Sequence, residues 1–527
     1  MSKTARNVGL GPLICLSLAS QALASEQPLS AIDWLKDPAP IQLSDPLQVA
    51  LPLQPGALTR DRSGVNTPRV EVTPLGQSRA DAAGLLSPQT TGLPATLWRE
   101  SATDTLVALM QRLPPDPLPA LQSLYYTLLL AEAEPPADAR GKPVFLKARL
   151  DALRRLGAVD PALALADQAG ISDRSVFDQW FDLSLLTGTE DDACAALKTN
   201  PALTQRYDTR IFCLARMGDW PTAALTLQNA RALDAVEPRT ANLLEAFLDP
   251  ELIGTTPDTA PSAAVMTPLL FRLHEAVGTP LPTANLPREY AMADLRGLSG
   301  WKAEIEAAER LTHSGALPAN TLLGLYTNQS PAASGGVWGR AAGVQALERA
   351  LNDRDAQTVA EILPPLWKAM RREGLAVAFS ALFAEPLADL PLEGDARRLT
   401  FQIALLSPDY ERLTGDLIGA DTSGYDTGDL FLASIARGAP DASLARSAGQ
   451  QAVVAGFAAS TASRDHADLL DTGRLGQAIL LAALQLDASG PNAVYDIEAG
   501  LATLRALGLE ETARRAALEI LLLRSGT

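Results

Sequence analysis

Histidine is the side chain best suited to catalysis or metal binding near neutral pH, and this chain has three histidines in 527 residues. His274, His313 and His466 lie far apart, and none has a second histidine or a cysteine within a helical turn. This spacing does not fit the ligand patterns of zinc sites. Asp465-His466-x-Asp468 comes nearest to an acid–base or metal-binding fragment, and we interpret it as the solvated start of a helix. No metal ligand and no cofactor is therefore predicted.

Motifs for nucleophilic or phosphate chemistry are also missing. The sequence contains no Gly-x-Ser-x-Gly elbow, no His-Glu-x-x-His and no P-loop. The nearest glycine-rich loop, residues 334–339, opens a predicted helix, where backbone amides are able to hold an anion. A turn anchored by Trp338 explains this loop without a ligand. No catalytic residue is predicted.

Cys194 and Cys213 are the two cysteines that remain if the first 24 residues are removed. Residues 199–206 between them contain Pro201 and predict a turn between two antiparallel helices, which would bring the sulfurs to one level. In an oxidising compartment such a pair forms a disulfide bond, worth about 3 kcal/mol for a loop of this length. Two buried free thiols are the alternative.

The first 24 residues have the three parts of a secretory signal peptide. Lys3 and Arg6 supply positive charge, residues 8–18 are mainly apolar, and Ala22-Leu23-Ala24 fits the cleavage pattern. The apolar stretch is shorter than the roughly 20 residues that a membrane-spanning helix needs. We expect an exported, periplasmic protein with no integral membrane span in the mature chain.

The chain is acidic, with a formal net charge of −17. Residues 1–24 carry two cations and no acid, so their removal leaves −19. This charge opposes phosphate backbones and anionic lipids, which excludes nucleic acid as a partner. A protein or a glycan remains as the class of partner. Charged residues are 20% and apolar residues 47%, a globular composition.

Residues 25–95 form a Pro-rich segment, with ten prolines between 25 and 94. Such a composition favours extended backbone. Ile32, Trp34 and Leu35 make one compact apolar cluster within it. We interpret these three residues as a candidate docking peptide for a partner groove. The alternative is that they pack back on their own domain.

From Trp98 onward the pattern becomes helical. Ser101-x-x-Asp104 predicts a capping box, followed by leucines at helical spacing. Glycine, proline and aspartate then interrupt an Ala/Leu-rich sequence every ten to sixteen residues, without alternating β-branched runs. This predicts an all-α chain with helical-repeat regions at 96–260 and 261–527.

An internal repeat accounts for part of these helices. Four glycines end a helix, and in each case an alanine follows five positions later, where a second helix would cross closely. A single helical hairpin of this length cannot bury its apolar face, so the hairpins must stack. The pairs are Gly157 and Ala162, Gly188 and Ala193, Gly218 and Ala223, and Gly508 and Ala513.

This turn, with its Leu-x-x-Leu-Gly sequence, resembles the tetratricopeptide repeat (TPR) and its degenerate relatives. Residues 143–233 and the last 35 residues carry the resemblance, and the middle of the chain shows it weakly. The family's early tryptophan and closing proline are not regular here. The resemblance implies a TPR-like α-solenoid, a right-handed superhelix whose concave face binds proteins.

Three further segments, residues 92–98, 210–216 and 331–338, are similar to uncharacterised exported proteins of Rhodobacter-type alphaproteobacteria. Some members carry the label "antifreeze glycopeptide polyprotein". That label calls for monotonous Ala-Ala-Thr tripeptides, which this sequence does not contain. The resemblance implies a bacterial group and no activity.

Arg99-Glu100-Ser101, followed by Leu109-Met110-Gln111, is similar to motifs of the soluble lytic transglycosylases. That resemblance implies a general acid at Glu100. Ala108 replaces the family's glycine, the spacing is short, and the later motifs of the catalytic domain are missing.

The sequence thus favours a periplasmic, non-catalytic helical-repeat scaffold or adaptor that binds a cell-envelope protein. A peptidoglycan-acting enzyme, or an inactive relative of one, is the alternative. A glycan or small-molecule binding protein is a further alternative.

Overall fold

The computed structural model describes residues 80–139, 142–170, 173–249, 251, 265–419, 422, 424–488 and 492–524. The expected signal peptide and the candidate docking peptide of Ile32, Trp34 and Leu35 lie outside these residues. The described residues are helical, as predicted, and their one strand-like pairing is a parallel bridge between Leu86 and Ala131. No described helix has the length and apolar character needed to span a bilayer.

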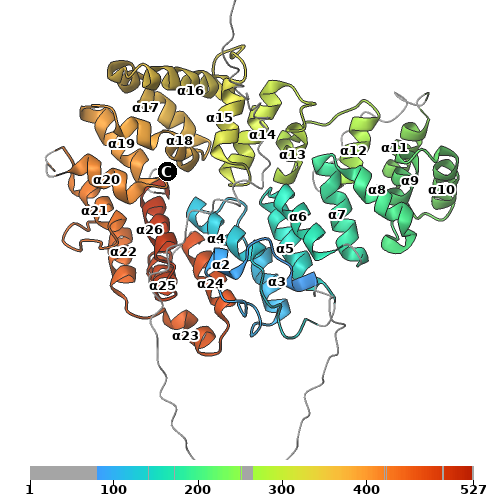
Figure 1. The fold of residues 1–527 in the computed structure, drawn as a ribbon, viewed down its shortest axis with the longest axis horizontal. Helices are drawn as coiled ribbons and strands as arrows, with labels where there is room; N and C mark the ends of the chain where they lie inside the picture. Colours follow the sequence, from blue (N-terminus) through green and yellow to red (C-terminus); the bar gives the residue numbers. More distant parts are fainter. Residues whose placement is uncertain are drawn as a thin grey trace, which may run out of the picture.

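The first group of helices forms the lower centre of the view in Figure 1. Its elements are η1 (Ala80–Ala82), α2 (Pro88–Thr91), α3 (Thr103–Gln111), α4 (Pro119–Leu130), α5 (Val144–Arg155) and α6 (Val159–Ala169).

Residues 80–95, expected to be the end of the extended Pro-rich segment, instead contain the short helices η1 and α2. The buried guanidinium of Arg149 on α5 explains the difference. It donates to the carbonyl oxygens of Ala83 (2.7 Å), Leu129 (2.7 Å) and Ala131 (3.0 Å). These bonds hold the leading segment against the end of α4.

The predicted capping box at Ser101 is not formed. Ala102 is the N-cap of α3 and makes no side-chain hydrogen bond, and the Ser101 hydroxyl is buried without a partner in the described residues. The carboxylate of Asp138 instead accepts from the Thr103 amide at 3.0 Å. A residue 35 positions away, which a local motif does not include, therefore caps this helix.

The second group projects from the molecule (Figure 1). Its last helix packs back against its first. We call residues 190–248, which span α8 to α11, the arm. The elements of the group are α7 (Arg174–Thr187), α8 (Glu190–Thr199), η2 (Pro201–Leu203), α9 (Tyr207–Arg216), α10 (Trp220–Ala232), α11 (Pro238–Leu248) and α12 (Pro268–Ala276).

The third group continues the stack, and each long helix from α14 to α21 packs on the next one along the chain. Its elements are η5 (Thr283–Asn285), η6 (Arg288–Tyr290), α13 (Ala291–Asp294), α14 (Trp301–His313), α15 (Ala319–Thr327), α16 (Gly336–Asn352), α17 (Ala356–Arg372), α18 (Ala376–Ala388), α19 (Gly394–Leu405), α20 (Tyr410–Ile418) and α21 (Thr427–Ala436).

The last group returns to the first (Figure 1, red beside blue). Helix α26 packs on α4, and α24 packs on α3 and α4, so the helices close into a ring from which the arm projects. The elements are α22 (Ala448–Ala458), α23 (Arg464–Asp471), α24 (Leu475–Asp487), α25 (Ala493–Ala506), α26 (Glu510–Glu519) and a final π-helical turn, η7 (Ile520–Arg524).

The four repeat glycines all adopt positive φ, and the alanine that follows each of them is fully buried. The φ values are 85° at Gly157, 83° at Gly188, 86° at Gly218 and 78° at Gly508. Ala162, Ala193, Ala223 and Ala513 are all 0% exposed. Gly473 and Ala478 form a fifth pair with the same spacing, which was not among the predicted pairs. In each hairpin the alanine allows the second helix to cross its neighbours closely.

We call the junction that closes the ring the seam. It joins α24, α26 and η7 to residues 97–98, α3 and α4. The Gly476 amide donates to the Leu97 carbonyl at 3.1 Å. A Cβ atom at position 476 would lie 2.5 Å from the Trp98 indole, so only glycine fits there.

Candidate functional site

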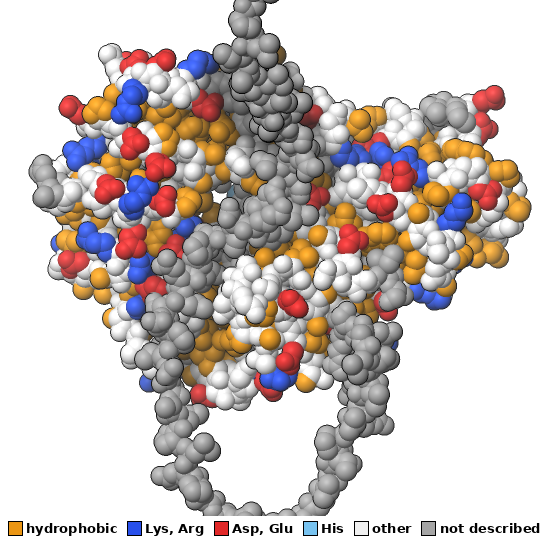
Figure 2. All heavy atoms as spheres, viewed as in Figure 1, with side chains coloured by type: hydrophobic (Ala, Val, Ile, Leu, Met, Phe, Trp, Pro, Cys, Tyr) orange, Lys and Arg blue, Asp and Glu red, His pale blue; other side chains and the backbone are white. Residues whose placement is uncertain are grey.

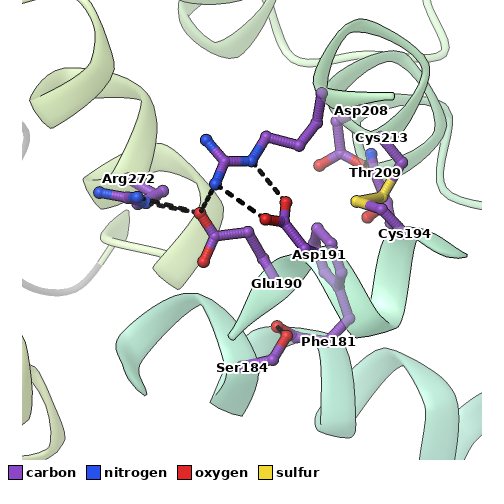
Figure 3. The surroundings of a disulfide bond; sticks show 10 residues. Phe181, Ser184, Glu190, Asp191, Cys194, Asp208, Thr209, Cys213 and Arg272 are labelled. Atoms are coloured by element: carbon purple, nitrogen blue, oxygen red, sulfur yellow. Dashed lines mark hydrogen bonds and ion pairs between the residues drawn. A yellow bond between two sulfur atoms is a disulfide. The ribbon is translucent and has the colours of Figure 1, made fainter. Parts of the chain in front are cut away.

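Cys194 on α8 and Cys213 on α9 form a disulfide bond in the arm (Figure 3). Both cysteines are buried, and their Cα atoms are 4.9 Å apart. The intervening residues 199–206 contain the short η2 turn, so α8 and α9 run antiparallel as the sequence predicts. The bond links two helices that also pack on other helices of this group, α8 on α7 and α9 on α10 and α11.

Glu190 connects the arm to the rest of the molecule (Figure 3). Its fully buried carboxylate lies 2.9 Å from Arg272 of α12 and 3.6 Å from Arg216 of α9. Glu275 continues the network by pairing with both Arg272 and Arg296. A buried carboxylate needs such partners, because an unpaired charge in the interior is costly. The base of the arm is therefore held by ion pairs as well as by packing.

An aromatic series runs from the ring to the end of the arm. Phe181 packs edge-on against Phe212, which stacks on Phe247, and Phe247 contacts Trp220. The phenyl rings of this series are largely buried, but Trp220 is 45% exposed. The arm's core thus reaches the surface at α10.

Large apolar side chains are exposed on α10 and in the turns just before and after it. Exposed fractions are 39% for Met217, 45% for Trp220, 58% for Leu225 and 68% for Leu233. We call these four residues the tip face. Figure 2 shows hydrophobic side chains gathered over this end of the arm. Helix α10 contains a single charged residue, Arg231, although a fifth of the chain is charged.

Carboxylates flank the tip face. Asp219 caps α10, Asp234 follows it, and Glu237 caps α11. The one cation on α10, Arg231, is paired with Glu245 at 2.8 Å. The tip face therefore carries no charged side chain of its own, lies among uncharged polar residues of α10, and has acidic groups near both ends.

A cavity of about 530 Å³ lies at the seam. We call it the seam cavity. Its walls come from the loop before α4, the end of α14, α17, the start of α18 and η7. The lining residues are Asp116, Pro117, Leu118, Pro119, His313, Trp367, Lys368, Arg371, Arg372, Gly374, Ala376, Leu523 and Arg524.

Two carboxylates fix the wall of this cavity. Asp487 accepts hydrogen bonds from the Leu118 amide and the Tyr125 hydroxyl, both at 2.9 Å. Glu519 accepts from the Ala120 amide at 2.9 Å. Burial raises the pKa of Asp487 to about 6 and that of Glu519 to about 8. The carboxyl groups of these two residues, from α24 and α26, accept hydrogen bonds at the N-terminus of α4. The first backbone N–H groups of a helix have no partner within the helix and favour such acceptors.

No family model, curated protein or solved structure matches this chain. The two candidate surfaces, the tip face and the seam cavity, are therefore interpreted from their own geometry.

The three histidines lie apart in the structure. His274 and His466 are buried, with their Nδ1 atoms 3.1 Å from the Thr279 hydroxyl and 2.8 Å from the Thr503 hydroxyl, respectively. The fragment around His466 begins α23 as expected, but the His466 side chain is buried against α25 rather than solvated. Burial lowers the pKa of all three histidines. Among the described residues, no group of three metal-binding side chains comes together.

Glu100, the candidate general acid, lies at the surface. Its carboxylate is 3.5 Å from the Arg99 guanidinium, and its side chain is 56% exposed. A glycosidase acid is normally held in an apolar pocket that keeps it protonated. The surroundings of Glu100 do not provide this environment.

The loop at residues 334–339 opens α16 as expected, with Gly336 as the first helical residue. Trp338 packs against Trp301, with ring centroids 5.0 Å apart. This contact matches the interpretation of Trp338 as a packing anchor.

The cations of the seam cavity were not among the residues that the sequence predicts to form a site. Lys368, Arg371 and Arg372 form a cluster within five residues of an acidic chain, which is a visible signal. Their meeting with Arg524 is not visible in the sequence, because it depends on closure of the ring.

Proposed function

We propose that this chain is a periplasmic helical-repeat scaffold that binds a protein of the cell envelope through the tip face. The observation that carries the proposal is the exposure of Trp220 and Leu225 on α10, a helix with one charged residue, and of Leu233 at its C-cap. Exposed apolar surface of this kind, rimmed by polar groups, is typical of protein–protein interaction sites. The signal peptide predicted at residues 1–24 supports the location.

The surroundings of the tip face favour one kind of partner. Asp219, Asp234 and Glu237 place negative charge at both ends of the apolar surface. A partner with apolar side chains flanked by lysine or arginine would match this pattern in both shape and charge. We therefore propose a basic, apolar surface on an envelope protein as the ligand of the arm.

Tryptophan is the residue type most often found at the energetic centre of an interface. Trp220 meets this condition, because its indole is supported from below by Phe247 while part of it faces solvent. The disulfide and the Glu190 ion pairs hold the helices beneath the tip face in place, which lowers the entropic cost of binding.

Site-directed photocrosslinking in a native host tests the proposal. A photoreactive amino acid at position 225 is expected to crosslink one envelope protein, and the same amino acid at position 298 is not. Leu298 is the matched control because it is 76% exposed and lies outside the arm. The crosslinked protein would then be purified and its affinity for the chain measured.

The double variant Leu225→Glu, Leu233→Glu is expected to bind the purified partner at least tenfold more weakly, because it places charge in the apolar interface. Leu298→Glu is expected to bind as the wild type does. Equal crosslinking at positions 225 and 298, or unchanged affinity in the double variant, would refute the tip face as the binding site.

A further inference from the structure

Four cationic side chains and a single carboxylate line the seam cavity. Lys368, Arg371, Arg372 and Arg524 all reach it from α17 and η7. Lysine and arginine side chains donate hydrogen bonds and accept none. Trp367, which also lines the cavity, has a buried indole N–H without a partner in the described residues, and the side chain is 6% exposed. Side-chain donors outnumber side-chain acceptors in this lining, and a ligand rich in oxygen atoms would supply further acceptors.

Of these four cations, two form hydrogen bonds that hold the fold and two do not. Arg371 donates to the Leu522 carbonyl at 2.8 Å, and Arg524 donates to the Leu486 carbonyl at 2.7 Å. Lys368 and Arg372, by contrast, form no hydrogen bond or ion pair within the described part of the chain. Their charges are therefore free to interact with a ligand.

Little negative charge faces the four cations. Asp116 is the one carboxylate among the lining residues, and it is paired with Arg288. Asp487 lies behind the wall and contacts Arg524 at 3.2 Å. Glu519, the other carboxylate behind the wall, is protonated at neutral pH because its pKa is about 8. The cavity thus has a net positive charge in a strongly acidic chain, which concentrates anions there.

We propose that the seam cavity binds a small, multiply charged oxyanion that carries two or more phosphate or carboxylate groups. The volume of about 530 Å³ lies within the usual range of sites for small organic ligands. Guanidinium groups suit these ligands because their planar N–H pairs match the oxygens of phosphate and carboxylate. Binding at this position would strengthen the contact between α17 and η7 that Arg371 already makes. The inference goes beyond the proposed scaffold function and does not depend on the tip face.

Isothermal titration of the purified full-length chain with inorganic pyrophosphate and with citrate tests the proposal. We expect one binding site per chain, with affinity that falls as salt is added because the charges are screened. Binding of pyrophosphate alone would assign phosphate esters, binding of citrate alone would assign polycarboxylates, and binding of both would assign the shared charge pattern.

The double variant Lys368→Gln, Arg372→Gln is expected to weaken binding at least tenfold, and its unfolding midpoint is expected to stay unchanged because neither side chain holds the fold. Trp367→Phe keeps an aromatic ring and removes the N–H donor, and it is expected to weaken binding at least threefold. Arg437→Gln, at an exposed cation that ends α21, is the matched control for loss of charge. Absence of binding by both probes, or equal affinity in the double variant, would overturn the proposal.

Discussion

The arm projects from the ring and the seam closes it, and the two regions are stabilised in different ways. A stack of helical hairpins leaves an apolar face open at each end unless a cap covers it. At the seam the two ends of the ring cover each other, since α26 lies on α4 and α24 on α3. The arm has no such partner, and α10 packs mainly on α9 and α11. Apolar surface therefore remains exposed on the arm and is buried at the seam.

The two regions also differ in the chain distance that their contacts span. The arm's disulfide joins residues 19 positions apart. The hydrogen bonds from Leu118 to Asp487 and from Ala120 to Glu519 span 369 and 399 positions. Long-range contacts form only after the rest of the ring has folded, whereas a local covalent link acts on one hairpin. The comparison predicts that damage to the arm stays local and damage to the seam spreads around the ring.

Loss of the disulfide should have the largest effect, and that effect should be confined to the arm. The double variant Cys194→Ala, Cys213→Ala is expected to lower the stability of α8 and α9 by about 3 kcal/mol. Hydrogen exchange would show faster exchange in these helices and unchanged protection in α26. Reduced wild-type protein is the matched control, because it keeps both sulfurs and loses only the link. Faster exchange around the whole ring would show that the arm is not independent.

Glu519 should make the seam sensitive to pH. Its pKa is raised from 4.5 to about 8 in the folded chain, chiefly by burial. A raised carboxyl pKa gives stability that is complete below about pH 4.5 and is lost as the pH rises through 8. Between pH 6 and pH 9 this loss is roughly 2.5 kcal/mol. Urea unfolding at several pH values would measure it.

Glu519→Gln is expected to remove most of that pH dependence, because the amide oxygen still accepts from the Ala120 amide and does not ionise. Asp487, with its pKa of about 6, keeps a smaller dependence of the same sign at lower pH. Glu498→Gln on the exposed face of α25 is the control. An unchanged pH profile in Glu519→Gln would place the titrating group elsewhere.

Gly476→Ala should weaken the seam by about 2 kcal/mol. A new Cβ atom would lie 2.5 Å from the Trp98 indole and 2.9 Å from the Leu97 carbonyl oxygen. Overpacking of this kind costs about 1–3 kcal/mol. Hydrogen exchange should increase in α3 and α4 as well as in α24, although α3 and α4 are far away in sequence.

Gly415→Ala on α20 is the matched control, because no neighbouring side chain lies within 4 Å of the place that a Cβ atom would take. This change should instead stabilise the helix by up to about 1 kcal/mol. If the two variants were equally stable, the close approach at Gly476 would not matter for the seam.

The difference between the regions also explains which features were predictable. Helical periodicity and the turn glycines are local, so the sequence predicts the all-α fold and the hairpins at Gly157, Gly188 and Gly218. The cysteine pair is visible because it flanks one short turn. The closure of the ring is not visible, because Leu97 and Gly476 are brought together by the summed curvature of all the helices between them.

The two candidate sites also differ in whether the local sequence predicts them. The tip face lies on α10 and the turns at its two ends, within residues 217–233, so its apolar residues and the single charge of α10 are visible in the sequence alone. The seam cavity combines residues 116–119 with α17 and with Arg524. No spacing within the sequence indicates that combination, although the basic cluster on α17 is a partial signal.

The smallest effect on stability is expected at the tip face. Leu225→Gln and Leu233→Gln each replace a largely exposed side chain, so the free energy of unfolding should change by no more than about 0.5 kcal/mol. Leu227→Gln, at a buried position on the same helix, should cost at least about 2 kcal/mol. Thermal unfolding of the three variants would show whether the exposed leucines are retained for the fold. A large destabilisation by Leu225→Gln would mean that this surface is covered within the chain itself, and it would argue against an external partner.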